Sequence, residues 1–301
     1  MFITKWGARV FIVFLILVSC NRPTTQTNIT QIATSLFPIF DMARNIVGDR
    51  ADVFFVVPIG ANPHTYEPMP SEVQRMQRVD VCIGIHPEFD GWMKDYIPAS
   101  ARVLSLQEKI DYHEMEESAH PSHDTGGEDH HHNPHIWLSV RNAKAIVSQI
   151  TEIMVELDVE NRDVYKRQAQ EYLELLDRLD VEIDGLWKEV EQKRFIQWHP
   201  AWDYFAHDYG LEIVGTIEHG HGDQPSVREF KSLVGEARRK HVKVVVIGLN
   251  LESSATQALV DEIAGTLVRL DTIGDPEDED RNSYIQLMRH NARLLVKAFN
   301  P

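Results

Sequence analysis

Residues 161–192, NRDVYKRQAQEYLELLDRLDVEIDGLWKEVEQ, are the stretch of sequence that decides the fold. The stretch contains no proline and only one glycine, Gly185, and its apolar residues recur at helical spacing among many charges. At 1.5 Å per residue, about 30 residues form a helix of roughly 45 Å, which is longer than one domain needs. The heptad register of a coiled coil is not kept. We therefore expect one long helix that runs alongside two lobes. The apolar positions are Tyr165, Tyr172, Leu176, Leu179, Ile183, Leu186 and Trp187.

Short β-rich runs alternate with helical patterns on both sides of this helix, which is typical of α/β layers around parallel sheets. The expected strands are 29–35, 52–57, 81–85 and 102–106 before the helix, and 194–198, 211–216, 242–247 and 266–270 after it. Capping boxes are expected to open helices at 71–74, 226–229 and 283–286. The prediction is an α/β fold with two parallel-sheet lobes, at 29–160 and 193–301, bridged by the long helix 161–192.

The composition bounds the function. The chain has 301 residues and a formal net charge of −16, which excludes a general nucleic-acid binder and suits a cationic partner. Seven of the 15 histidines fall between His113 and His135. Only two cysteines are present, Cys20 and Cys82, which excludes a disulfide scaffold and a thiolate zinc finger. Cys82 lies in an apolar run and is expected to be a small buried hydrophobic residue.

The first residues have the pattern of a targeting segment. Lys5 and Arg9 precede an apolar run at 10–18 that is too short to span a bilayer. The sequence LVSC at 17–20 resembles the bacterial lipobox. It predicts a lipoprotein signal peptide at 1–19, a lipid on Cys20 and a polar tether at 20–28, which would hold the protein on the outer side of a bacterial membrane. An ordinary signal peptide followed by a chance cysteine is the alternative.

Three histidines and one aspartate stand where parallel strands are expected to end, which is where open sheets bind ligands. His64 lies in NPHTYEP at 62–68, His135 in NPHIW at 133–137 and His199 in HPAW at 199–202, and Asp271 closes the strand 266–270. A single histidine at such a place is commonly structural. Three of them beside prolines, with one carboxylate, favour a metal site. Zinc suits such a nitrogen and oxygen set, whereas manganese prefers more oxygen.

These motifs resemble those of the cluster A-I solute-binding proteins, which deliver zinc or manganese to ABC importers. The resemblance rests on NPHxYEP at 62–68, NPHIWLS at 133–139, HPAWxYF at 199–205 and LDT at 270–272 followed by YxxLMxxN at 284–291. It implies two α/β lobes with the metal in the cleft between them, a permease as partner, and the ligands His64, His135, His199 and Asp271. Histidine at position 199 is the choice of the zinc-preferring members, whereas manganese-preferring members have glutamate there.

The chain departs from the family pattern at Asn133 and in the C-terminal disulfide of some zinc members, which a single free cysteine cannot form, and the fourth ligand is left open. Asn133 stands where members usually have aspartate, and Glu218 is an alternative to Asp271 as fourth ligand. The tract 113–132 lies between the first two motifs, where such a tract is typical of the zinc-preferring members. It has no Lys or Arg and is expected to be an irregular loop that collects zinc. The alternative for this tract is a solvated acidic insertion without function. Its histidines are His113, His120, His123, His130, His131 and His132.

The sequence therefore predicts a monomeric extracytoplasmic protein that captures Zn²⁺ for an ABC importer and that is not an enzyme. A manganese-binding member of the same family, a zinc-dependent hydrolase and a binding protein for an organic chelate are the alternatives. The His-Glu-x-x-His pattern of many zinc hydrolases does not occur in the sequence.

Overall fold

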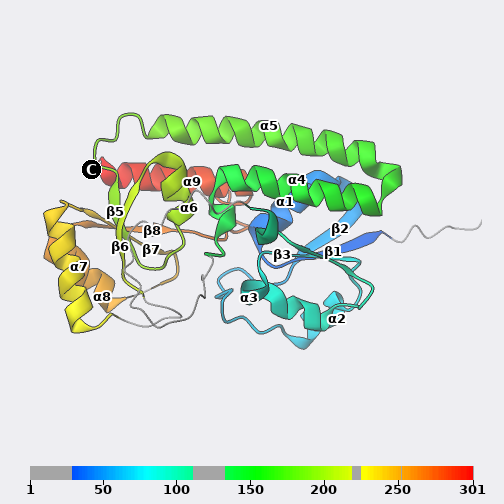
Figure 1. Cartoon of the computed structure of the whole chain (residues 1–301), viewed down its shortest axis with the longest axis horizontal. Coiled ribbons are helices and arrows are strands. Elements are labelled where there is room, and N and C mark those ends of the chain that lie inside the picture. Colours follow the sequence, from blue (N-terminus) through cyan, green and yellow to red (C-terminus); the bar gives the residue numbers. More distant parts are fainter. Residues whose placement is uncertain (1–28, 111–132, 219–224, 252, 301) are drawn as a thin grey trace, which may run out of the picture.

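The computed structural model describes residues 29–110, 133–218, 225–251 and 253–300. The chain folds into two lobes, each built on a four-stranded parallel sheet (Figure 1). The sheets have the orders β2-β1-β3-β4 and β6-β5-β7-β8. The strands are β1 (Thr30–Thr34), β2 (Ala51–Phe55), β3 (Val81–Gly84), β4 (Arg102–Ser105), β5 (Arg194–Gln197), β6 (Glu212–Thr216), β7 (Val244–Gly248) and β8 (Thr266–Leu270). All eight expected strands are present, with ends that differ by at most two residues.

The two sheets have the same topology, because the first strand of each lobe pairs with both the second and the third. The loops that follow these strands therefore meet at one edge of each sheet, where parallel sheets bind ligands. The helices are α1 (Phe37–Val47), α2 (Pro70–Met76), α3 (Pro87–Asp90), α4 (Val140–Leu157), α5 (Arg162–Leu186), α6 (Asp203–Tyr209), α7 (Val227–Arg239), α8 (Ser254–Ile263) and α9 (Tyr284–Phe299). Short 3-10 helices lie at Gly48–Arg50, Gly91–Tyr96, Gln107–Lys109, Ile136–Leu138 and Val159–Asn161.

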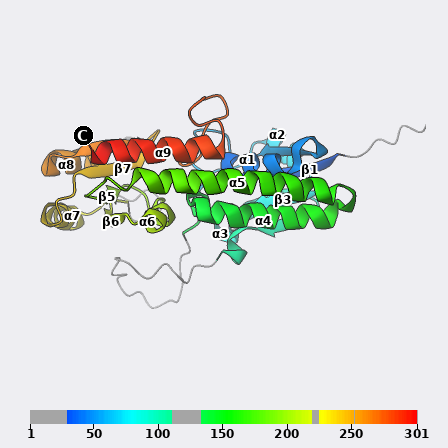
Figure 2. The ribbon, with the colours of Figure 1, turned by 90° about the horizontal axis from the view of Figure 1, so that it is seen from above.

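Helix α5 confirms the expected long helix. Its 25 residues span about 38 Å, and it packs against α1 and α4 of the N-terminal lobe and α9 of the C-terminal lobe (Figure 2). The helix ends at Leu186 rather than near residue 192. Trp187 follows as the C-cap and turns its indole into the core against Phe205 and Phe299. Residues 187–192 form turns and an irregular segment in place of the last turns of the expected helix.

One of the three expected capping boxes is confirmed, and at a second only the cap itself is present. Ser226 caps α7 in a box with Glu229, and Ser283 accepts a hydrogen bond from a backbone N–H of α9. The box expected at 71–74 is wrong. Helix α2 begins earlier, because Pro70 occupies its first turn, and Glu72 accepts from the backbone N–H of Met69 instead.

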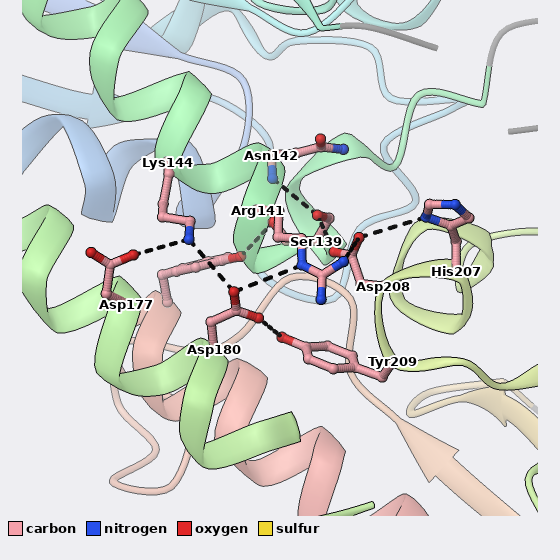
Figure 3. A network of polar contacts seen from close by, with 10 residues as sticks. Ser139, Arg141, Asn142, Lys144, Asp177, Asp180, His207, Asp208 and Tyr209 are labelled. Carbon is pink, nitrogen blue, oxygen red and sulfur yellow. Dashed lines mark hydrogen bonds and ion pairs between the residues drawn. The ribbon is translucent and has the colours of Figure 1, made fainter. Parts of the chain in front are cut away.

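The two lobes share one apolar core. The largest cluster of buried side chains contains Ile32 and Val81 of the first sheet and Val244 and Leu270 of the second, connected through α5 and α9. A polar network on one side adds to this connection (Figure 3). It joins α4, α5 and α6 through contacts of Ser139 and Arg141 with Asp208, and of Arg141 with Asp180. The lobes are therefore packed together as well as covalently linked.

Some predictions concern residues outside the described part of the chain: the signal peptide at 1–19, the tether with Cys20, and the tract 113–132. Cys82 is 2% exposed, as expected for a small hydrophobic residue of the core. Within the described residues, none of the helices combines the length and the apolar character needed to cross a membrane.

Candidate metal centre

The three predicted histidines lie together. His64 comes from the loop after β2, His135 from the segment just before α4, and His199 from the loop after β5. One ring nitrogen of each lies within 4.8 Å of those of the other two. Since His64 and His135 belong to the N-terminal lobe and His199 to the C-terminal lobe, the group straddles the two lobes. It is the only group of three or more potential metal-ligand side chains found among the described residues.

The spacing of the ring nitrogens fits a tetrahedral metal ion. The Nε2 atom of His135 lies 3.4 Å from that of His64 and 3.3 Å from that of His199. Zinc binds histidine nitrogen at about 2.0 to 2.1 Å, so two ligand atoms of a tetrahedral site stand about 3.3 to 3.4 Å apart. Both distances from His135 therefore fit Zn²⁺.

Hydrogen bonds on the opposite ring nitrogens direct two of the Nε2 lone pairs toward this common point. The Nδ1 atom of His199 lies 2.8 Å from the carboxylate of Glu218, to which it donates. The Nδ1 atom of His135 lies 2.7 Å from Oδ1 of Asn133. The Nδ2 group of Asn133 donates to the carbonyl of Pro200 at 2.8 Å, and this hydrogen bond fixes the orientation of the amide. Both rings thus carry their proton on Nδ1 and offer Nε2 as a ligand.

The environment keeps His135 uncharged. It is 4% exposed, and burial, together with the nearby imidazoles of His199 and His64, lowers its pKa well below the ordinary value. A neutral imidazole is the form that binds a metal ion. The rings of Phe89 and Trp137 pack around the histidines, with Phe89 4.9 Å from His64 and Trp137 5.3 Å from His135 between ring centroids. These apolar rings restrict the positions that the ligands can adopt.

The two candidate fourth ligands have other partners in this arrangement. Asp271 follows β8 as expected, but its carboxylate pairs with Arg281 and accepts from the backbone N–H of Ile273. Glu218 contacts His199 through Nδ1, on the side of the ring that faces away from the other histidines. Neither carboxylate joins the group of three histidines.

Asp203 was not singled out from the sequence, although it contributes to the site. It lies at the start of α6, and Oδ2 of its carboxylate accepts hydrogen bonds from Asn133 at 3.1 Å and from Gln197 at 3.2 Å. Its position is the unspecified one in HPAWxYF. The signal that could have revealed it is the polar Gln197 within a strand that is otherwise apolar at its centre.

Comparison with known proteins shows the family to which the chain belongs. The family model described as zinc-uptake complex component A, periplasmic (ZnuA), matches residues 32–298. The high-affinity zinc uptake system protein ZnuA of Bacillus subtilis is 28% identical, with 98% of this chain and 99% of that protein covered. The manganese-binding lipoprotein MntA of Halalkalibacterium halodurans is 27% identical, with 97% of each chain covered.

A crystal structure of ZnuA has the same fold. It superimposes with a TM-score of 0.76 at 27% identity and covers 90% of this chain and 99% of that one. The resemblance drawn from the motifs is confirmed, and so are the two parallel-sheet lobes bridged by a long helix. Since the matched segment includes both lobes and all three histidines, the chain belongs to the family of the periplasmic zinc-uptake complex component A, ZnuA.

Proposed function

We propose that this protein binds Zn²⁺ with high affinity outside the cytoplasm and delivers it to an ABC importer. The observation that carries the proposal is a group of three histidines contributed by both lobes, in which Nε2 of His135 lies at the edge length of a zinc tetrahedron from Nε2 of each of the other two. Membership of the zinc-uptake family supports it. Zinc is here the cargo, so binding must be reversible when the protein meets its transporter.

Zinc is favoured over manganese by the chemistry of the ligands. Three imidazoles make a nitrogen-rich site, which suits zinc, whereas manganese prefers carboxylate and carbonyl oxygen. The similarity to MntA, a manganese-binding lipoprotein, keeps manganese as the second candidate. His199 is the residue that decides between them, because glutamate at this position would add a charged oxygen ligand.

We propose Asp271 as the fourth ligand and Glu218 as the residue that orients His199. The hydrogen bond from Trp137 to the carbonyl of Thr272, at 2.6 Å, places the turn after β8 beside the segment that carries His135. A carboxylate oxygen has lone pairs to spare, so Asp271 can pair with Arg281 and still bind a metal ion. Glu218 is less suited, because binding the metal would break its hydrogen bond to His199.

Release of the metal would follow from separation of the lobes. His64 and His135 would stay on one lobe, while His199 would leave with the other. A site reduced from four ligands to two binds zinc far more weakly, so a permease that draws the lobes apart would unload it.

We propose no catalytic role for the site. A zinc hydrolase would need a metal-bound water and a free general base beside it, and Glu218 is already engaged with His199. The anchor on Cys20, a monomeric state and the zinc-collecting role of the tract 113–132 belong to the same proposal. Each is supported by the sequence pattern alone.

Competitive titration of Zn²⁺ against Mn²⁺ tests the proposal, with wild type compared with His199→Glu and with His241→Glu, at an exposed position after α7, as a matched control outside the group of three. Wild type should prefer zinc, and His199→Glu should shift the preference toward manganese while the control does not. Tighter binding of manganese than of zinc by wild type would refute the zinc assignment.

A further inference from the structure

We infer that Asn133 is a positioning residue that joins ligand orientation to closure of the two lobes, an inference that rests on the proposed zinc site. The Oδ1 atom of its side chain contacts the N-terminal lobe, because it accepts from both the backbone N–H and Nδ1 of His135, at 3.0 and 2.7 Å. The Nδ2 group contacts the C-terminal lobe, because it donates to the carbonyl of Pro200 at 2.8 Å. Pro200 directly follows the ligand His199.

The backbone of Asn133 is held from both lobes as well. Its carbonyl accepts from the hydroxyl of Tyr204 at 2.9 Å and from the amide of Gln107 at 3.3 Å. Tyr204 belongs to α6 and Gln107 to the N-terminal lobe. The residue therefore has hydrogen-bond partners in both lobes through its side chain and through its main chain.

Asp203 explains why an amide stands at position 133. The carboxylate of Asp203 accepts from Nδ2 of Asn133 and from Gln197, and the fully buried Gln197 is itself fixed by Thr216 and by the backbone of Trp202. An aspartate at 133 would have no donor for Pro200 or Asp203, and two carboxylates would face each other at about 3 Å, where like charges repel. The negative charge of Asp203 therefore does not contact the ring of His135 directly. The neutral amide of Asn133 lies between them and hydrogen-bonds to both.

This arrangement has a consequence for metal binding. His199 is supported by the carboxylate of Glu218, whereas His135 is supported by a neutral amide. When the lobes part, Asn133 must lose its contacts with Pro200, Asp203 and Tyr204, and only its contacts with His135 and Gln107 remain. Opening the lobes would therefore weaken the support of His135, a ligand of the N-terminal lobe, at the same time as it removes His199.

The first test uses Asn133→Ala in the full chain, with Asn45→Ala, at the surface of α1, as the matched control. We expect Asn133→Ala to weaken Zn²⁺ binding by about tenfold to hundredfold, measured by chelator competition. In the metal-free protein, long-range ¹H–¹⁵N correlations of the imidazole should show His135 protonated on Nδ1 in wild type and a mixture of tautomers in the variant. The tautomer is read without metal, so it tests Asn133 even if wild type proves to bind zinc weakly, which would instead refute the proposed function. Unchanged affinity together with an unchanged tautomer would overturn the inference.

The second test exchanges the two side chains. Asn133→Asp should lower the melting temperature of the metal-free protein by several degrees, because its carboxylate faces Asp203. Asp203→Asn in that background should restore most of the loss, since the new amide donates to the new carboxylate, whereas Asp203→Asn alone should not raise the melting temperature. If the double variant melts no higher than Asn133→Asp, the pairing of positions 133 and 203 is refuted.

Discussion

Glu218 is the residue whose charge acts on the metal through a ligand. Its carboxylate accepts the Nδ1 proton of His199, which fixes the ring and raises the basicity of Nε2. Glu218→Gln retains an acceptor but removes the charge, so zinc should bind about tenfold more weakly. Glu218→Ala removes both and should cost up to about a hundredfold. Chelator competition measures both, with Glu171→Gln on the surface of α5 as control. Wild-type affinity in Glu218→Ala would contradict the orienting role.

Asp90 gives the protein a pH-dependent stability that is independent of the metal. Burial raises its pKa from 3.8 to about 6, although backbone N–H groups of Ile85 and His86 donate to it. Between about pH 4 and pH 6 the folded state therefore holds a proton that the unfolded state has lost, and raising the pH through 6 removes stability. Relative to Asp90→Asn, wild type should gain about 1 kcal/mol between pH 7 and pH 5.

The measurement for Asp90 is denaturant unfolding of zinc-free protein at several pH values, with the surface substitution Asp49→Asn as matched control. The difference in free energy of unfolding between wild type and Asp90→Asn should grow as the pH falls. A difference that stays constant over this range would show that Asp90 does not titrate there.

At the scale of the element, α4 begins at a residue that serves two purposes. Ser139 caps the helix by accepting from the backbone N–H of Asn142, and its hydroxyl donates to Asp208 on α6 (Figure 3). Ser139→Ala should cost about 2 to 3 kcal/mol, because loss of a cap costs about 1 kcal/mol and a buried carboxylate loses a donor. Ser226→Ala, at the exposed cap of α7, should cost only about 1 kcal/mol. Urea unfolding compares the two, and equal losses would refute the contribution of Asp208.

The elements were largely predictable, and the reasons are physical. Strands of parallel sheets are buried on both faces and so appear as short apolar runs bounded by turns. The end of α5 was not predictable, since residues 187–192 contain no proline or glycine and the packing of Trp187 against Phe205 and Phe299 is visible only in the folded chain. The start of α2 could have been placed from Pro70, which favours the first turn of a helix.

The metal centre was predictable in part. His64, His135 and His199 stand beside prolines at strand ends, so their motifs are visible in the sequence. The roles of Asn133 and Asp203 depend on contacts between residues 70 positions apart, across the two lobes, and periodicity carries no information about such pairs. The contact of Asp271 with Arg281 is likewise a property of the folded turn. Its role as fourth ligand stays a prediction.

At the scale of the whole molecule, contacts between the lobes limit how far they can separate. The hydroxyl of Tyr284 on α9 lies 2.9 Å from the carbonyl of Trp137 and 3.1 Å from that of Ser139, both in the N-terminal lobe. The backbone N–H of Tyr284 donates to Asp41 on α1 at 2.9 Å. Because α5 and the shared core add to these bonds, we expect motion of about 1 to 2 Å at the packed helices rather than a wide hinge.

Spin labels on the two lobes can measure this motion in a chain that carries Cys20→Ser. Cysteines introduced at Val103 and Val227, which are 41% and 73% exposed, provide one label on each lobe. The native Cys82 will not react, because it is buried and burial raises the pKa of its thiol to about 12. Double electron–electron resonance should then give distances between the two labels that differ by only a few ångströms between zinc-loaded and zinc-free protein.

Tyr284→Phe should loosen the lobes in the same experiment. The substitution keeps the ring in the core but removes the hydroxyl that bonds to Trp137 and Ser139, so the zinc-free distance distribution should broaden, whereas the matched variant Tyr96→Phe should leave it unchanged. Zinc should narrow the distribution again, because His199 on one lobe and His64 and His135 on the other share the ion. A wild-type shift as large as the spacing of two packed helices, about 8 to 10 Å, would show instead that the shared core opens and that release is a hinge motion.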